Sequence, residues 1–176
     1  MDHNKQKEIL KWILRRVDRA KRHRRELEER LERIRAERES PIGSPGYEPL
    51  PRVMEPGNGA ASIVLKIADI EDRLYEQKDE LEKAYVQVMD IIDFIPQPEP
   101  ARRIFELYHL DGLRFNKVAE AIPMSRSRAY EIYDEVLDGL LGIQKVQDMV
   151  KDFEDNYINW FVKQEKVRTN KVTLNK

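Results

Sequence analysis

The sequence contains no cysteine. The chain therefore forms neither disulfides nor thiolate metal sites, which favours a reducing compartment. It also lacks any apolar run near the ~20 residues that span a bilayer. Its first residues, MDHNKQKEIL, lack the apolar core of a secretion signal. We therefore expect a cytoplasmic protein that does not associate with membranes.

Motifs typical of enzymes are also missing. The three histidines, His3, His23 and His109, are far apart and show no metal-ligand spacing. The sequence has no glycine-rich phosphate loop, no nucleophile elbow and no HExxH. Its many paired carboxylates fall on predicted helix faces, where solvation explains them. We therefore expect no catalysis, no cofactor and no bound metal.

Charge is abundant, at 37% of residues, and it is unevenly distributed. Residues 1–39 hold fourteen Lys/Arg against nine Asp/Glu, whereas residues 60–95 hold four against nine. The two segments thus carry balances of +5 and −5. This complementarity indicates that they lie together as helices.

Both segments show heptad seams, which predict an all-α protein with a long coiled coil. The first predicted helix runs from Lys5 to Glu39, and the second from Ala60 to Ile95. The first seam comprises Leu10, Ile13, Val17, Ala20, Arg24, Leu27, Leu31 and Ile34. The second comprises Ile63, Ile67, Ile70, Leu74, Gln77, Leu81, Ala84, Val88, Ile91 and Ile95. An antiparallel hairpin within one chain and an intermolecular coiled coil both fit.

The basic stretch KWILRRVDRAKRHRR in the first helix has two interpretations. It could bind phosphates, since closely spaced cations release counterions when they meet a polyanion. It could instead be the solvated face of a coiled coil, which is the more common use of such charge runs. We favour the second interpretation.

Proline-rich segments divide the chain. Residues 40–59 are rich in Pro, Gly and Ser and predict a linker. Residues 96–100, PQPEP, predict a stiff spacer. After this spacer we expect a helix-turn-helix unit over 101–142 and a C-terminal helix and tail over 143–176.

The helix-turn-helix unit is predicted to contain helices over 99–110, 114–122 and 126–141, with a turn at Asp111-Gly112 and a corner at Pro123. Twelve apolar residues have the spacing of a shared core. They are Leu107, Leu110, Leu113, Phe115, Val118, Ala119, Ile122, Met124, Ala129, Ile132, Val136 and Leu140.

The start of the last helix carries the candidate functional residues. Ser125 is placed to cap this helix. Five residues on its outer face could read base edges in a major groove, since Arg pairs with guanine, Glu accepts from cytosine and Tyr meets a thymine methyl. These are Arg126, Ser127, Arg128, Tyr130 and Glu131. Candidate contacts to the DNA backbone are Arg114, Lys117, Arg102 and Arg103.

This unit is not basic overall. Residues 101–142 hold six Lys/Arg against seven Asp/Glu. Phosphate neutralisation supplies most of the affinity of DNA-binding proteins, so the unit alone would bind weakly. We therefore expect help from a second subunit or from RNA polymerase. A helical trio that binds only proteins remains an alternative.

The stretch LYHLDGLRFNKVAEAIPMSRSRAYEIYDEVLDGLL resembles the region-four helix-turn-helix of bacterial sigma factors. Over roughly residues 5–141 the arrangement of segments resembles the ArpU-like family of phage and prophage late-transcription regulators. The resemblance implies a DNA-binding regulator in which Arg126, Ser127 and Glu131 meet bases, and Arg114 and Lys117 meet the backbone. The helix after Gly142 lies outside the shared pattern. It suggests an added interaction surface with Trp160 and Phe161 as anchors, although aromatic residues at helical spacing more often belong to a core.

We therefore expect a sequence-specific transcriptional regulator of phage late genes, located in the host bacterial cytoplasm if it is phage-encoded. The predicted partners are double-stranded DNA, host RNA polymerase, and further copies of the chain joined through the coiled coil or the C-terminal helix. Two other functions stay open: a small terminase-like DNA-packaging protein, and a polymerase-docking module that does not touch DNA.

Overall fold

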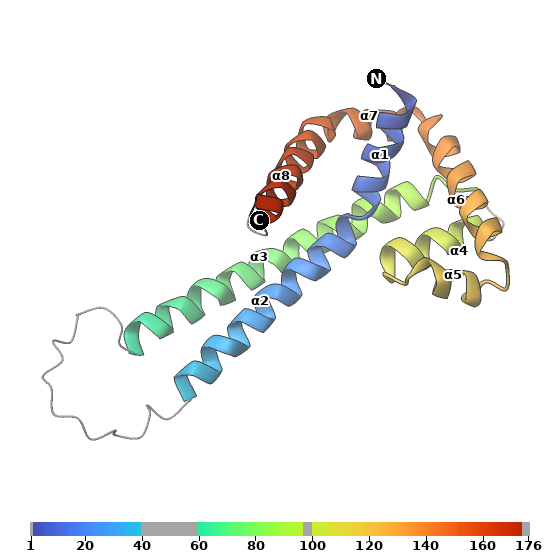
Figure 1. The fold of residues 1–176 in the computed structure, drawn as a ribbon. Helices are drawn as coiled ribbons and strands as arrows, with labels where there is room; N and C mark the ends of the chain where they lie inside the picture. Colours follow the sequence, from blue (N-terminus) through green and yellow to red (C-terminus); the bar gives the residue numbers. More distant parts are fainter. Residues whose placement is uncertain (1, 40–59, 97–99, 174–176) are drawn as a thin grey trace, which may run out of the picture. The chain divides into compact units, whose positions relative to one another are not determined.

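The computed structural model describes residues 2–39, 60–96 and 100–173, and the secondary structure in these ranges is entirely helical (Figure 1). The all-α prediction is confirmed. Nine helical elements follow one another in these ranges: α1 (His3–Leu14), α2 (Arg16–Glu39), α3 (Ala60–Ile92), α4 (Ala101–Phe105), a π-helical turn η1 (Glu106–Leu110), α5 (Phe115–Ala121), α6 (Arg126–Leu141), α7 (Gln144–Asp152) and α8 (Glu154–Thr173). The predicted linker at 40–59 and the middle of the proline spacer lie outside the described residues.

The chain divides into two compact units. One unit, here called the arm, comprises Arg19–Lys83. The other, here called the head, comprises Met1–Asp18 and Ala84–Lys176. Within the described ranges, no helix combines the length and the hydropathy that a membrane span requires.

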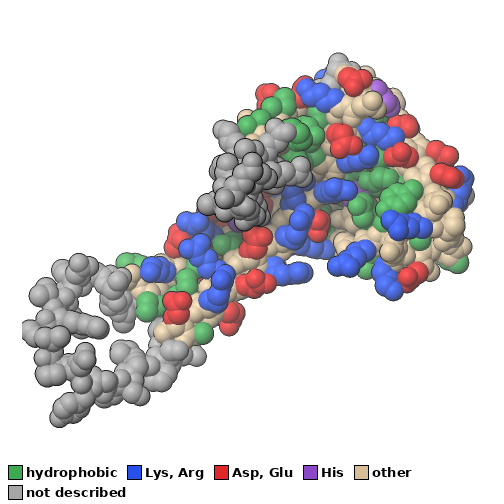
Figure 2. Space-filling model, viewed as in Figure 1, with side chains coloured by type: hydrophobic (Ala, Val, Ile, Leu, Met, Phe, Trp, Pro, Cys, Tyr) green, Lys and Arg blue, Asp and Glu red, His purple; other side chains and the backbone are tan. Residues whose placement is uncertain are grey.

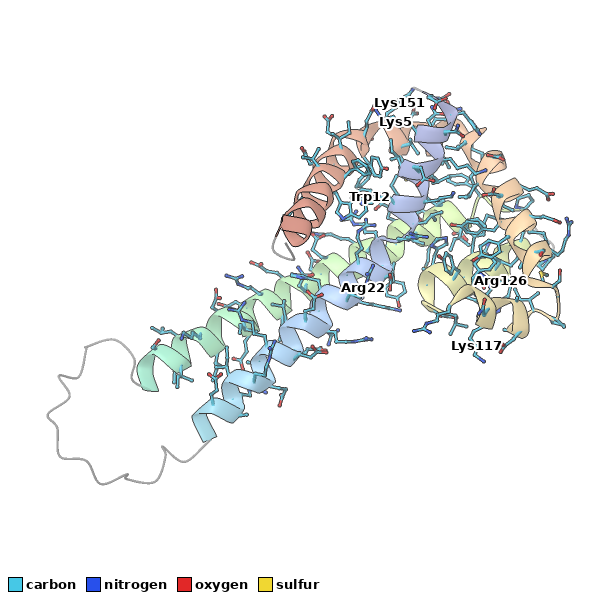
Figure 3. The ribbon with its side chains drawn as sticks, in the orientation of Figure 1. Lys5, Trp12, Arg22, Lys117, Arg126 and Lys151 are labelled. Atoms are coloured by element: carbon cyan, nitrogen blue, oxygen red, sulfur yellow. The ribbon has the colours of Figure 1, made fainter. Side chains whose placement is uncertain are left out.

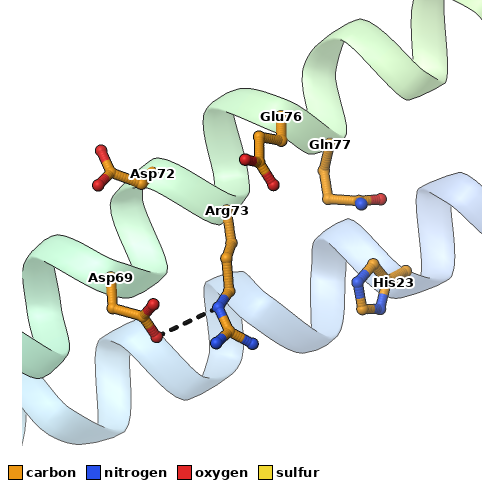
Figure 4. Close-up of a pocket in the computed structure, with 6 residues that line it drawn as sticks. All are labelled: His23, Asp69, Asp72, Arg73, Glu76 and Gln77. Carbon is orange, nitrogen blue, oxygen red and sulfur yellow. Dashed lines mark ion pairs between the residues drawn. The ribbon is translucent and has the colours of Figure 1, made fainter.

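In the arm, α2 and α3 run antiparallel and share a narrow apolar seam (Figure 1). Leu27, Leu31 and Ile70 are buried in this seam, and Ile34, Ile67 and Leu74 pack against them. Outside the seam, Arg35 pairs with Glu71 across the two helices at 2.9 Å. Figure 4 shows a polar pocket of the arm, where Asp69 pairs with Arg73 at 3.1 Å. The predicted antiparallel pairing therefore occurs within one chain.

The predicted continuous helix from Lys5 to Glu39 is instead two helices, because the backbone turns at Arg15 (φ −81°, ψ 7°). The reason lies in the width of the apolar face. Ile9, Leu10, Ile13 and Leu14 are all fully buried, and two adjacent pairs one turn apart cover more of a helix than a heptad seam does. This wide face lets α1 pack against α6, α7 and α8 in the head.

Other boundaries also differ from the predictions. Helix α3 stops at Ile92, three residues before the predicted end at Ile95. Phe94 and Ile95 donate to carbonyls only three residues back, because the residue before a proline disfavours helical backbone. The helix predicted over 99–110 begins at Ala101 and becomes π-helical at Glu106. The C-terminal helix is interrupted at Phe153, whereas α6 has the predicted bounds.

Candidate nucleic-acid interface

The corner between α5 and α6 is built by a few backbone and side-chain bonds. Ile122 and Ser125 are extended, which ends one helix and prepares the next. The Met124 N–H donates to the Ala119 carbonyl at 3.4 Å. Ser125 Oγ accepts from the Arg128 N–H at 3.2 Å, in the manner of an N-cap. Helix α6 therefore begins at Arg126 with its first turn fixed.

The turn before α5 depends on one glycine. Gly112 has φ +73°, which side chains with a Cβ rarely adopt. This conformation lets the Leu113 N–H donate to the Leu107 carbonyl at 3.0 Å, which reverses the chain after η1. Leu113 itself is 36% exposed, so its predicted place in the core is wrong.

The buried stripe of α6 includes the predicted residues Ala129 and Leu140, but its middle lies one position away from the predicted one. Tyr133 and Leu137 are buried, whereas the predicted core residues Ile132 and Val136 are only half-buried. The shift follows from α6 packing against α1 as well as against α4. The heptad seam of the first segment predicts that its residues 5–14 belong to the coiled coil, so it does not indicate this second contact.

An aromatic cluster supports this stripe from behind. Tyr133 stacks on Phe105 with ring centroids 4.8 Å apart, and Tyr108 meets Phe115 edge-on at 5.3 Å. The His109 Nε2 atom lies 3.1 Å from the Tyr133 hydroxyl. Burial, together with the charge of Arg15, lowers the pKa of His109 to about 3, and a backbone hydrogen bond to Leu14 opposes this shift. His109 is therefore a neutral core residue.

The five predicted base-reading side chains are all exposed on the first two turns of α6. The Tyr130 ring stacks on the buried Phe115 with centroids 3.8 Å apart and planes 7° apart. The Arg126 guanidinium lies over Tyr130, 5.5 Å from the ring centroid. Figure 3 labels Arg126 on this helix and Lys117 on the preceding one. Arg126 is thus held on an aromatic platform anchored in the core.

Arg128 and Glu131 contact each other at 3.0 Å. Both side chains are more than half exposed, and exposed ion pairs of this kind contribute only about 0–1 kcal/mol. Each group can therefore exchange its partner for a base edge at little cost. Ser127 is exposed beside them.

The four predicted backbone contacts differ in their surroundings. Arg114 is exposed at the start of α5 and has no acidic partner among the described residues. Lys117 pairs with Glu120 at 2.7 Å on an exposed surface. Arg102 bridges Asp93 at 2.6 Å and Glu106 at 3.1 Å, and these hydrogen bonds raise its pKa. Arg103 pairs with the same Glu106 at 3.3 Å.

These contacts rank the four cations. Arg114 and Lys117 remain available to phosphates, because the first has no acidic partner in the described ranges and the second has only an exposed one. Arg102 and Arg103 already serve an intramolecular network around Glu106.

Acidic side chains of α6 form ion pairs with residues of α1. Lys7 Nζ lies 2.9 Å from Asp138 and 3.4 Å from Asp134, and His3 lies 3.0 Å from Asp138. The hydrogen bond from Lys7 lowers the pKa of Asp138. Part of the negative charge of the helix-turn-helix is therefore compensated within the head.

The C-terminal helices pack on α1. Trp12 lies 6.2 Å from Phe153, 6.0 Å from Tyr157 and 6.2 Å from Trp160, measured between ring centroids (Figure 3). Trp160, predicted as an anchor for a partner, is thus part of an internal cluster. Phe161 remains 44% exposed.

Side chains of both signs are intermixed on the face drawn in Figure 2. Among the described residues, no three His, Asp or Glu side chains gather in a way that could hold a metal ion. Comparison of the chain with protein families, with curated proteins and with solved structures finds no match.

Proposed function

We propose that this protein is a sequence-specific, DNA-binding transcriptional regulator that controls phage or prophage late genes together with host RNA polymerase. The observation that carries the proposal is the capped α6, whose first two turns present polar side chains around a fixed aromatic platform. The link to late genes rests on the resemblance to sigma region four and to the ArpU-like family.

Each exposed side chain of α6 has a definite role in this proposal. Arg126 is oriented by Tyr130, and its guanidinium can pair with the O6 and N7 atoms of a guanine. Glu131 can accept from a cytosine amino group, and Arg128 or Ser127 can reach neighbouring bases. The stacked ring of Tyr130 offers an apolar edge to a thymine methyl.

Affinity and register come from contacts to phosphates. Arg114 and Lys117 are the available cations on and before α5. A second copy of the chain would double these contacts. The C-terminal helix α8 offers exposed apolar side chains for such an association, namely Ile158, Phe161 and Val162.

The proposal is tested by selection from a pool of random-sequence DNA duplexes with the full chain. We expect one motif to be enriched, and its binding to weaken steeply as salt is raised. A pool that stays random after repeated selection would contradict sequence-specific binding. Mass measurement of the free protein separates a regulator from a packaging protein, which would form a ring. Capture of RNA polymerase in the absence of DNA would favour the docking function.

A further inference from the structure

Two neighbouring hollows lie on the head where the end of α1 meets the helix-turn-helix. The first, of about 240 Å³, is lined by Arg15, Tyr108, Gly112 and Arg114 among others. The second, of about 230 Å³, is lined by Lys11, Arg15, Tyr108, Phe115, Tyr130 and Asp134, with Tyr133 beneath. Arg15 and Tyr108 line both hollows, so the two adjoin, and together they are here called the depression.

Arg15 stands at the centre of this depression, and its charge is not compensated by its nearest partner. Its Nη2 atom donates to the Tyr108 hydroxyl at 3.2 Å. A phenol at neutral pH carries no charge, so this bond orients the guanidinium without neutralising it. Arg15 is also the cap residue that directly follows α1, and it is exposed.

Arg114 and Lys11 add positive charge, and two acids also line the depression, Asp18 in the first hollow and Asp134 in the second. Arg114 has no acidic partner among the described residues. Lys11 pairs with Glu8 at 3.2 Å, but the Glu8 side chain is 58% exposed, so the pair is weak. The acid that lines the second hollow, Asp134, already lies 3.4 Å from Lys7. The depression therefore holds three cations, Lys11, Arg15 and Arg114, against these two acids, and its balance of charge is positive.

The depression is continuous with the proposed base-reading face. Tyr130 and Phe115 line the second hollow, and the same Tyr130 ring carries Arg126. When a helix lies in a major groove, the phosphate strands pass along its flanks. A cationic depression beside the start of α6 is therefore placed to meet one of these strands.

We infer that Arg15 and Lys11 bind backbone phosphates of the same DNA duplex that α6 reads, next to Arg114. This inference rests on the proposed function and deepens it. Helix α1, which lies outside the helix-turn-helix sequence, supplies charge that residues 101–142 lack. The basic stretch KWILRRVDRAKRHRR is therefore split between the two units. Lys11 and Arg15 belong to the head, whereas the residues after Asp18 belong to the arm.

The experiment measures binding of the full chain to its selected duplex and to a scrambled duplex over a range of salt concentrations. Arg15→Gln and Lys11→Gln should each reduce the steepness of the plot of log affinity against log salt by about 0.9, the value for one phosphate contact. Both should weaken binding to the two duplexes by the same factor, because phosphates carry no sequence information. Arg15→Lys should restore most of the slope.

Two controls make the result specific. Arg30→Gln removes the same charge from an exposed position on α2 and should leave the slope unchanged. Tyr108→Phe removes the hydroxyl that orients Arg15 but keeps its charge, so affinity should fall while the slope stays. Circular dichroism and the thermal midpoint report whether Arg15→Gln still folds, and Lys11→Gln carries the test if it does not.

The possible failures are distinguishable. If the wild-type chain binds no duplex, both the proposed function and this inference are overturned. If it binds but Arg15→Gln and Lys11→Gln leave the slope unaltered, only the inference fails. An equal loss of slope in Arg30→Gln would show that the total charge of the protein, and not contacts of Arg15 and Lys11, determines the slope. A change of sequence preference in Arg15→Gln would also contradict a phosphate contact.

Discussion

Ser125 fixes the residue at which the reading helix begins, because its Oγ accepts the Arg128 N–H. Replacing it with alanine leaves this N–H without its partner in the first turn. We expect Ser125→Ala to lower the free energy of unfolding by about 1 kcal/mol, measured by denaturant titration. Ser127→Ala, two residues along on the exposed face, is the matched control and should change little. Equal effects of the two substitutions would argue against the cap.

His109 makes the stability of the head depend on pH. Its pKa in the folded state, about 3, lies below the value of 6.5 expected in the unfolded chain. As pH falls, His109 therefore takes up a proton in the unfolded chain before it does so in the folded one. The stability that the neutral, buried His109 contributes is fully present above pH 6.5 and is lost as pH falls toward 3. The side chain faces Arg15, Tyr108 and Tyr133, and among these only Arg15 is charged near neutral pH.

Between pH 6.5 and 5 we expect protonation of His109 in the unfolded state to remove about 1 kcal/mol of stability per pH unit. Denaturant titrations at several pH values measure this slope. His109→Phe cannot take up the proton and should flatten the slope, even if it is less stable at pH 7. A slope that is the same in both proteins would show that His109 does not titrate as a buried group.

At the scale of elements, Trp12 of α1 packs against the C-terminal helices α7 and α8 within the head. Its ring lies near Phe153, Tyr157 and Trp160. Trp12→Ala should cost about 3 kcal/mol, the lower end of the range for large aromatic side chains, since Trp12 is half-buried. Hydrogen exchange should rise mainly in α7 and α8. Ile158→Ala on the exposed face of α8 is the control, and comparable effects of the two would contradict the anchoring role.

The elements differ in how well the sequence predicts them. Helix α6 was predicted at both ends, because Ser125 and Gly142 mark its limits locally. The α2–α3 seam was predicted from Leu27, Leu31 and Ile70, since period and charge complementarity act together. The turn at Arg15 is not predictable from the sequence, because no Pro or Gly marks it and the heptad seam continues through it.

In the candidate site, too, features set by local geometry are predictable from the sequence, whereas features set by tertiary contacts are not. The exposure of Arg126 and Glu131 follows from local helical geometry and was predicted. The stacking of Tyr130 on Phe115 depends on how α5 meets α6, and the role of Arg15 depends on a contact between segments ninety-three positions apart. Pairings of this kind are tertiary, and single-sequence periodicity contains no signal for them.

At the scale of the whole molecule, the arm and the head are separate compact units and should open independently. Ile70 is buried in the narrow seam of the arm, so Ile70→Ala should cost about 2 kcal/mol there. Hydrogen exchange should accelerate in α2 and in the part of α3 up to Lys83, while amides around Tyr133 keep their protection. The control Leu65→Ala alters a side chain that is 71% exposed. Faster exchange in both units would show that they unfold together.

The central claim is that α6 reads bases from its stacked Arg126. Its most direct test is the ratio of the dissociation constants for scrambled and selected duplexes, compared between the wild-type chain and Arg126→Ala at one salt concentration. We predict that the substitution reduces this ratio by about tenfold, corresponding to the ~1–3 kcal/mol carried by one good base contact. Glu131→Ala should alter the preference at a neighbouring position. An unchanged ratio in Arg126→Ala, with affinity for both duplexes intact, would contradict the assignment of α6 as the reading helix.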